Sequence, residues 1–300
     1  MESLKTILYF SIFQYPLTKE EIHSYNNHDD FSTTQAELDY LVAQKVTLQR
    51  DGFYVYPDNL QSIAKRLKGN LEAKKALIIA KKRAAFISKF PYVKAVGVSG
   101  SLSKGYYDDE SDIDFFIITK HSKLWICRTF LILYKKIFLL NSRKYFCTNY
   151  FISENHLEIE EQNRFTATEL KTLIPLQGKE VFEAFFKENN WVSGYFSNFK
   201  PTSEMIENTK KPFITKGVEF VFNTKFGSLI DLTFKSITLK KWNSKFHYLS
   251  KEEFEIALKT TTNISKHHPS NFQKKVISAL NEKIEKVQKE FKIELSKEYV

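Results

Sequence analysis

The chain has 300 residues, of which 42% are hydrophobic and 15% aromatic, and these proportions exclude an intrinsically disordered protein. The length allows two or three domains and a sizeable hydrophobic core. The formal net charge of +10 is compatible with a nucleic-acid partner, but a surplus of solvated surface lysine explains it more simply. Only two cysteines are present, Cys127 and Cys147, which is too few for a zinc site or a disulfide framework and indicates a reducing compartment.

Two apolar stretches need to be distinguished from targeting or membrane segments. The first 21 residues have Glu2 in front and no small-residue cleavage site behind, so they do not predict a signal peptide. The stretch 124–141 is interrupted by Arg128, Lys135 and Lys136, and it is short for a membrane span of about 20 residues. We therefore expect a core helix there, a cytoplasmic protein, and no membrane partner.

Residues 1–57 predict a small domain of three helices followed by a hairpin. The first helix precedes a capping box formed by Thr18 and Glu21, which opens the second helix. A further pair, Thr34 and Glu37, predicts the start of the third helix in the same way.

The hairpin of this domain is predicted at residues 46–57, around an Asp-Gly dipeptide at 51–52. Three helices and a hairpin resemble, by pattern, the winged helix-turn-helix modules of prokaryotic regulators. The third helix, within 33–45, carries Glu37 and Asp39, which disfavours contact with a row of phosphates. Two roles stay open for this module: contact with nucleic acid, and contact with a protein or orientation of a substrate.

Residues 58–90 predict a helical connector with a break at Gly69 and Asn70. Its basic side chains are opposed by Glu72 alone. They form either a solvated helix face or a basic wall beside an anionic substrate. The basic residues are Lys65, Arg66, Lys68, Lys74, Lys75, Lys81, Lys82, Arg83 and Lys89.

Residues 94–119 contain the chemically informative pattern. The apolar run "VKAVGVSG" predicts a strand that ends in small residues, and "DIDFFIIT" (112–119) predicts a second strand. Because side chains alternate along a strand, Asp112 and Asp114 are expected on one face. Two adjacent carboxylates at a buried strand are unfavourable unless a cation lies between them, and Mg²⁺ or Mn²⁺ suits such oxygen ligands. A turn at Gly100 and Ser101 can bring backbone N–H groups against phosphate oxygens.

This pattern, Gly100-Ser101 followed ten residues later by Asp112-Ile113-Asp114, resembles the signature of the polymerase-β-like nucleotidyltransferase superfamily. More loosely, the whole chain resembles uncharacterised prokaryotic proteins that join a winged helix to such a domain, through "YPLTKEEI", "SGSLSKG", "CTNYFIS" and "TATELKTLIPL". The resemblance implies that Gly100 and Ser101 hold the β- and γ-phosphates of a nucleoside triphosphate such as ATP, with Ser99 beside them. It also implies that Asp112 and Asp114 bind Mg²⁺ and that pyrophosphate leaves.

The superfamily adds a third carboxylate from a later strand, and here the chain departs from the pattern. The next predicted strand, 144–152, has Asn149 at the expected place, and an amide is an uncharged and poor proton acceptor. Three alternatives stay open. Another acid (Glu154, Asp108 or Asp109) completes the site, the substrate supplies the anion, or the domain binds nucleotide without turning it over.

Two weaker candidates lie outside the catalytic set. Lys104 either reaches a phosphate or is a solvated turn residue. His267 and His268 have no partner at metal-ligand spacing, so a loop or helix-end role is expected for them.

We thus predict an α/β (α+β) protein with a small mixed-sheet nucleotidyltransferase core. The expected domains are a winged helix (1–57), a basic connector (58–90), the core (91–155) and a helical C-terminal region (156–300). The expected function is metal-dependent transfer of a nucleoside monophosphate to an unknown acceptor, which is RNA, a protein or a small molecule. The alternatives are a nucleotide-binding regulator and a DNA-binding regulator with a degenerate enzyme domain.

Overall fold

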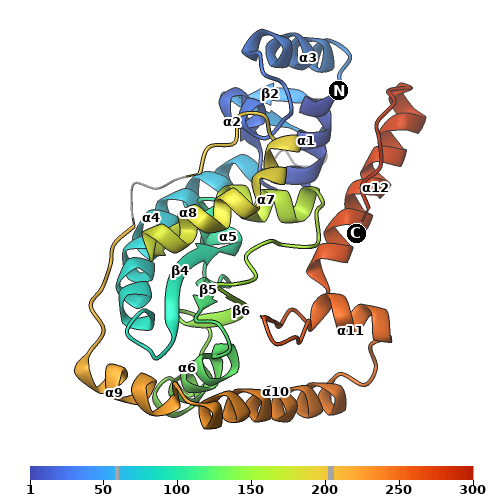
Figure 1. The fold of residues 1–300 in the computed structure, drawn as a ribbon. Coiled ribbons are helices and arrows are strands. Elements are labelled where there is room, and N and C mark those ends of the chain that lie inside the picture. Colours follow the sequence, from blue (N-terminus) through green and yellow to red (C-terminus); the bar gives the residue numbers. More distant parts are fainter. Residues whose placement is uncertain (58–60, 202–205, 300) are drawn as a thin grey trace.

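The computed structural model describes residues 1–57, 61–201 and 206–299. Residues 1–57, called here the N-terminal module, contain three helices and a small sheet at one end of the molecule (Figure 1). The sheet has the order β1-β3-β2, with both pairings antiparallel. The elements are α1 (Glu2–Ser11), β1 (Leu17–Thr18), α2 (Lys19–Ser24), α3 (Phe31–Ala43), β2 (Leu48–Arg50) and β3 (Phe53–Val55).

The local signals in this module are confirmed with one exception. Thr18 and Glu21 form the predicted capping box of α2, and a two-residue turn at 51–52 joins β2 to β3. The prediction that Thr34 caps the third helix is wrong, because α3 begins earlier and Asp30 accepts hydrogen bonds from its first turn. The three helices and the hairpin follow in the predicted order, but the strand β1 between α1 and α2 was not predicted, and the classification as a winged helix stays a prediction.

The connector forms one long helix, α4 (Ser62–Ile87), while its predicted beginning at 58–60 lies outside the described residues. The predicted break at Gly69 and Asn70 is wrong. Gly69 lies inside the helix, and the ring of Tyr106 packs against its backbone. A Cβ at this position would lie 2.3 Å from that ring. The glycine therefore allows close packing here and does not end the helix.

A five-stranded mixed sheet lies at the centre of the molecule, in the order β7-β4-β5-β6-β8. Only β5 and β6 run parallel, and the other neighbours are antiparallel. The strands are β4 (Val93–Ser99), β5 (Asp114–Thr119), β6 (Cys147–Ser153), β7 (Ile174–Gln177) and β8 (Ile264–Lys266). The one-turn helix α5 (Gly100–Ser103) follows β4, and α6 (Leu124–Phe138) joins β5 to β6.

Two of these strands come from the region predicted to be helical. Within the region 156–300, predicted to be helical, α7 (Arg164–Thr172) ends at Thr172 and the following β7 pairs with β4. From near the end of the chain, β8 adds to the other edge of the sheet. The central sheet therefore extends beyond the predicted core of 91–155, because two short edge strands that are distant in sequence complete it.

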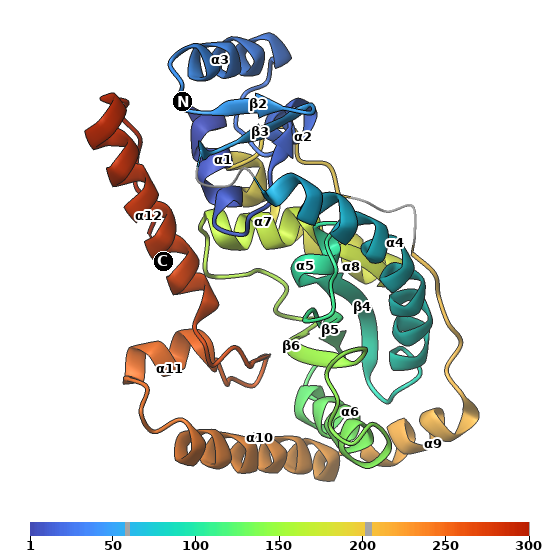
Figure 2. The ribbon, with the colours of Figure 1, turned by 180° about the vertical axis from the view of Figure 1, so that it is seen from behind.

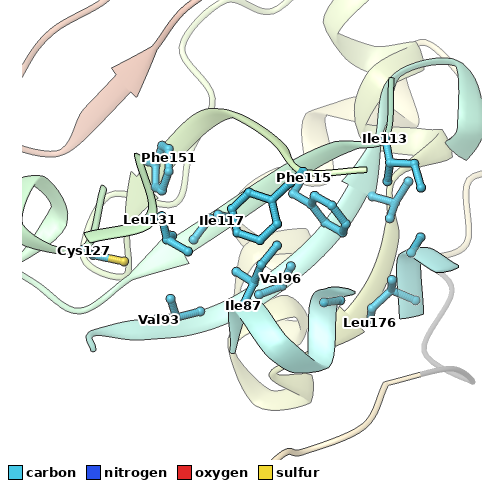
Figure 3. Packing of buried hydrophobic residues seen from close by; sticks show 14 of the residues in the cluster. Ile87, Val93, Val96, Ile113, Phe115, Ile117, Cys127, Leu131, Phe151 and Leu176 are labelled. Atoms are coloured by element: carbon cyan, nitrogen blue, oxygen red, sulfur yellow. The ribbon is translucent and has the colours of Figure 1, made fainter. Parts of the chain in front are cut away.

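The two faces of the sheet are covered by different helices. Phe115 and Ile117 of β5 pack on one side with α4 and α6, and Figure 3 shows them beside Ile87 and Leu131. Phe116 and Ile118 point to the opposite side, toward α7 and α8 (Lys179–Glu188). This alternation is the period-two pattern of a strand buried on both faces.

The remaining helices surround this core (Figure 2). They are the 3₁₀ turn η2 (Asn190–Gly194), α9 (Phe213–Phe222), α10 (Lys225–Lys245), α11 (Lys251–Ala257) and α12 (Phe272–Phe291). The last of these, α12, packs against α1, so the N-terminal module shares a hydrophobic cluster with the C-terminal region. Within the described ranges, no helix is both long and apolar enough to cross a bilayer.

Candidate active site

The site begins where β4 ends and β5 begins, because Ser99 is the direct partner of Asp114 in the sheet. Gly100 follows Ser99 with φ +72°, a conformation that a side chain disfavours. A Cβ on Gly100 would lie 2.7 Å from Oδ2 of Asp114, so the carboxylate lies directly against the glycine backbone. The predicted proximity of the aspartate to the Gly-Ser turn is thus present in the structure.

The strand itself starts later than predicted, at Asp114 instead of Asp112. Asp112 nevertheless continues the alternation, because the intervening Ile113 is fully buried while both aspartates are partly exposed. The backbone of Ile113 bonds to Lys144 and Cys147 on the neighbouring segment, which extends the strand-like pairing to this position. The charge of Asp112 acts on Asp114, so the two carboxylates lie near one another.

The carboxyl of Asp114 has an unusual environment. Burial raises its pKa to about 6, and the negative charges of Asp112 and Glu169 add to this effect. A hydrogen bond with the thiol of Cys147 and the charge of Lys104 act in the opposite direction. The carboxylate form is therefore destabilised here, and a cation bound beside it would relieve the cost.

The Gly-Ser turn is held in place by its own neighbours. The backbone oxygen of Gly100 accepts hydrogen bonds from Oγ of Ser103, at 2.9 Å, and from Nζ of Lys104, at 3.1 Å. The turn is also tied to the N-terminal module, since the hydroxyl of Tyr15 donates to the backbone oxygen of Lys104 at 3.1 Å. Ser99, Gly100 and Ser101 all line the adjacent cavity.

Asn149 lies on β6 at an irregular position. The pairing of β5 with β6 shifts by one residue between Phe115 and Phe116, and Asn149 is the residue that the shift leaves without a partner on β5. Its side-chain Nδ2 donates to the sulfur of Cys147 at 2.9 Å, and its backbone oxygen accepts from His267. Asn149 lines the same cavity as Asp114, as expected from its place in the sequence.

The three other acids considered from the sequence lie elsewhere. Glu154 is at the far end of β5, where its backbone N–H donates to the oxygen of Thr119 and its side chain pairs with Lys94. Asp108 stabilises the turn before the strand by accepting from Tyr106 and Ser111. Asp109 is exposed, and its backbone oxygen accepts from Lys144. None of the three belongs to the cavity lining described here.

Asp114 opens into a cavity of about 480 Å³ whose walls come from distant parts of the chain. The N-terminal module contributes aromatic side chains from α1 and the segment after it. The segment around β8 and the start of α12 forms another wall, and α7 forms a third. Prominent lining residues are Phe10, Phe13, Tyr15, Phe165, Thr166, Glu169, Leu170, Leu173, Lys266, His268 and Phe272. The volume is in the range of small-molecule sites.

Sequence reasoning missed Glu169 of α7. Its carboxylate lines the cavity, pairs with Nζ of Lys104 at 2.6 Å, and acts electrostatically on Asp114. A signal was available, because Thr166, Glu169, Leu170 and Leu173 have helical i, i+3, i+4, i+7 spacing and all line the cavity. An acid on the inner face of a buried helix is uncommon and indicates a specific partner.

Lys266 and His268 were also underestimated. Both line the cavity, and burial lowers the pKa of His268 to about 4, so its imidazole is neutral at physiological pH. Burial also lowers the pKa of Lys266, whose Nζ donates to Gln273 at 3.3 Å. His267, by contrast, packs against Trp242 and Phe246 and is structural.

The donor set suits Mg²⁺ or Mn²⁺ that arrives with a nucleotide. In the described parts of the chain there is no group of three or more His, Cys, Asp or Glu side chains arranged to hold a metal by themselves. Mg²⁺, however, is usually bound by one or two carboxylates together with substrate phosphates. Asp112 and Asp114 can supply those carboxylates, and the pKa of Asp114 is raised by burial and by the neighbouring negative charges.

The comparison with protein families agrees with this geometry. Residues 79–173 match the family model described as the nucleotidyltransferase domain. The matched segment contains the Gly-Ser turn, both aspartates, Asn149 and Glu169. No curated protein and no solved structure matches the chain significantly. The nucleotidyltransferase domain therefore accounts for the central part of the chain, while α1 and α12, which also border the cavity, lie outside the match.

Proposed function

We propose that this protein is a metal-dependent nucleotidyltransferase that transfers a nucleoside monophosphate from a nucleoside triphosphate to an acceptor. The observation that carries the proposal is the position of Asp114, whose carboxylate lies against Gly100 and lines the cavity. This arrangement puts an anionic metal ligand next to a turn suited to phosphate. The match of residues 79–173 to the nucleotidyltransferase domain supports the same chemistry.

In this proposal each group has a defined task. The Gly100-Ser101 turn binds the terminal phosphates, and Asp112 and Asp114 hold the divalent cation, which neutralises phosphate charge when bound. An acceptor oxygen attacks the α-phosphorus, the bond from the α-phosphorus to its bridging oxygen breaks, and pyrophosphate leaves. When the acceptor is a hydroxyl, its proton passes to a carboxylate.

Glu169 is our candidate for that carboxylate, in place of the acid missing at Asn149. It lines the cavity, and its ion pair with Lys104 fixes its position relative to Gly100, whose oxygen also accepts from Lys104. Asn149, an amide, cannot accept the proton effectively. Its side chain instead contacts Cys147, which in turn faces Asp114.

The N-terminal module acts as a wall of the site and favours the substrate-orienting role among those considered. Phe10, Phe13 and Tyr15 line the cavity. The module is tied to α4 by a bidentate ion pair between Arg66 and Glu21, at 2.6 and 2.7 Å. No basic side chain of the connector, Arg66 included, is among the cavity-lining residues of the described chain, which fits a solvated face better than a basic wall.

The proposal is tested by incubating the purified protein with Mg²⁺ and labelled nucleoside triphosphates and measuring pyrophosphate release. We expect release that requires the metal and is abolished in the double variant Asp112→Ala, Asp114→Ala. The matched control is Asp51→Asn in the hairpin, where asparagine tolerates the left-handed backbone and activity should be unchanged. Unchanged release in the double variant would exclude this site as the catalytic centre.

A second candidate function is nucleotide binding without turnover, which the amide at Asn149 favours. In that case a triphosphate with Mg²⁺ raises the melting temperature, since binding to the folded state stabilises it, while no pyrophosphate appears. Loss of this rise in melting temperature in the Asp114→Ala variant would indicate that the nucleotide binds beside Asp114 and Gly100. Absence of any shift in the unaltered protein would argue against both functions.

A further inference from the structure

Helix α9 has its apolar side turned toward solvent. On the inner side, Oγ1 of Thr215 donates to the backbone oxygen of Lys89 at 2.8 Å, and Glu219 accepts from the backbone N–H of Tyr92 at 2.7 Å. A surface helix normally buries its apolar stripe and exposes its polar side. In α9 the polar residues Thr215 and Glu219 make contacts with the core beside the apolar Phe222, which packs against Phe130, so the polarity of the helix is largely inverted relative to that rule.

The outward side of α9 is strongly apolar. Phe213, Ile214 and Phe220 are 90%, 81% and 81% exposed, and Val221 is 59% exposed. With Gly217, these residues have the spacing i, i+1, i+4, i+7, i+8 of a single helical stripe. A continuous apolar stripe of this kind is unfavourable in water and marks a contact surface.

Helix α10 continues this surface. Its inner side is anchored by Asp231, which accepts from the backbone N–H of Ile126 at 2.8 Å, and by the buried Trp242. Its outer side carries Phe226 and Leu229, which are 65% and 61% exposed, together with the exposed Leu232 and Ile237. By helical geometry Phe226, Leu229 and Ile237 fall on the side opposite Asp231, while Leu232 lies at its flank. We call the outward sides of α9 and α10 the α9–α10 face.

The charges on this face have one sign. Exposed lysines accompany the apolar residues on both helices, whereas the two helices contain only two acids, Glu219 and Asp231. Glu219 is paired with Lys211 at 2.5 Å, and Asp231 is buried. The exposed lysines of this face are Lys216, Lys225, Lys240 and Lys241, whereas Lys245 lies on the side of α10 that carries Asp231.

We infer that the α9–α10 face binds the surface of an anionic lipid bilayer, with α9 and α10 lying in the plane of the interface. Apolar side chains enter the acyl boundary while lysines reach the anionic headgroups, which is the chemistry of interfacial helices. A second copy of the chain fits less well, because a two-fold contact brings identical lysine-bearing surfaces together without acids to neutralise them.

This mode of binding agrees with the rest of the molecule. We expected no membrane partner from the sequence because it has no spanning segment, and binding in the interface plane needs none. Helices α9 and α10 lie at the end of the molecule opposite the N-terminal module (Figure 1), while the nucleotidyltransferase core lies between them. The inference does not depend on the proposed catalytic activity.

The test is flotation of the intact protein with vesicles of equal parts phosphatidylcholine and phosphatidylglycerol, compared with pure phosphatidylcholine. We expect binding to the anionic vesicles that is at least about tenfold stronger and weakens with added salt. The double variant Phe213→Ser, Phe220→Ser should lose about tenfold or more of this affinity. Both residues are highly exposed, so its melting temperature should equal that of the unaltered protein.

The matched control is the double variant Leu71→Ser, Ile78→Ser on α4, a basic helix on which these residues are 61% and 60% exposed. It should bind vesicles as well as the unaltered protein. Three results would overturn the inference: no binding to anionic vesicles, equal loss in both double variants, or a lipid-free dimer in light scattering that dissociates only in the α9 variant. The last result would assign the face to a second copy of the chain.

Discussion

An acidic residue lies at each end of β5, and the two differ in burial and in the charges around them. At its last residue, Thr119, the neighbouring Glu154 is paired with Lys94 at 3.3 Å and accepts from the backbone N–H of His121 at 3.2 Å. At its first residue, Asp114 is near two further carboxylates and its pKa is raised to about 6. The contacts of Glu154 stabilise its carboxylate. The carboxylate of Asp114 is destabilised by burial and by the negative charges beside it.

This difference is the one expected between a structural acid and a functional one. A paired carboxylate at the edge of a sheet contributes modestly to stability. A buried carboxylate that the protein leaves unneutralised is destabilising by itself, so its retention requires another benefit, such as a bound cation or substrate. Asp114 begins β5 and Glu154 follows β6, and the parallel pairing of these two strands brings Glu154 to the far end of β5.

The largest expected effect is on turnover. Asp114→Asn should lower pyrophosphate release by about a thousandfold or more, because it removes a metal ligand at the reacting phosphate. Glu154→Gln, at the other end of β5, should leave turnover unchanged. Steady-state assays with saturating Mg²⁺ compare the two variants, and equal losses would contradict the contrast between the two ends.

The next effect concerns Glu169. Glu169→Gln should reduce kcat by about tenfold to a hundredfold, with a flattened dependence on pH in the acidic range, if this carboxylate accepts the acceptor's proton. The matched control is Glu161→Gln, because Glu161 also lines the cavity and, like Glu169, is paired with a lysine, Lys259 at 3.1 Å. An unaltered pH profile in the Glu169 variant would rule out the proton-accepting role.

The third expected effect is on the free energy of unfolding of the metal-free protein. The folded-state pKa of Asp114 is raised from 3.8 to about 6, so the protonated form is favoured by folding, and stability is lost as pH rises through that range. Asp114→Asn should therefore stabilise the metal-free protein by about 1–2 kcal/mol near neutral pH, with no gain below about pH 4. Urea unfolding with a chelator at several pH values measures this, and a destabilised variant at neutral pH would refute the sign.

The smallest expected effect is the change in stability when Glu154 is replaced. Glu154→Gln should lower the free energy of unfolding by less than about 1 kcal/mol, because its ion pair with Lys94 is partly exposed. The loss should shrink at high salt, which screens the pair. A loss of several kcal/mol would show that this end of β5 is more sensitive than its contacts indicate.

Local patterns in the sequence were sufficient to predict β4, β5 and the Gly-Ser turn that follows β4. The spacing from Gly100 to Asp114 predicted two strands and a turn between them, and the structure has all three. The capping box at Thr18 and the hairpin turn at 51–52 were also readable, since each is determined by a few adjacent residues. The roles of Asp112, Asp114 and Asn149 stay predictions.

The parts that were missed depend on contacts between distant segments. The pairing that makes Ile174–Gln177 a strand is with β4, about eighty residues earlier, and no local pattern reports it. Glu169 joins the site only because α7 packs beside the Gly-Ser turn. The inverted polarity of α9 was likewise hidden, because its periodicity is that of an ordinary amphipathic helix.

The packing of α1 against α12 has a consequence for biosynthesis. A nascent chain that has emerged only as far as β7 already contains the phosphate turn and the acids, but it lacks the wall formed by β8 and α12. At that stage the cavity has no wall on the side that β8 and α12 later form. The cavity therefore gains the wall formed by β8 and α12 only after α12 is translated.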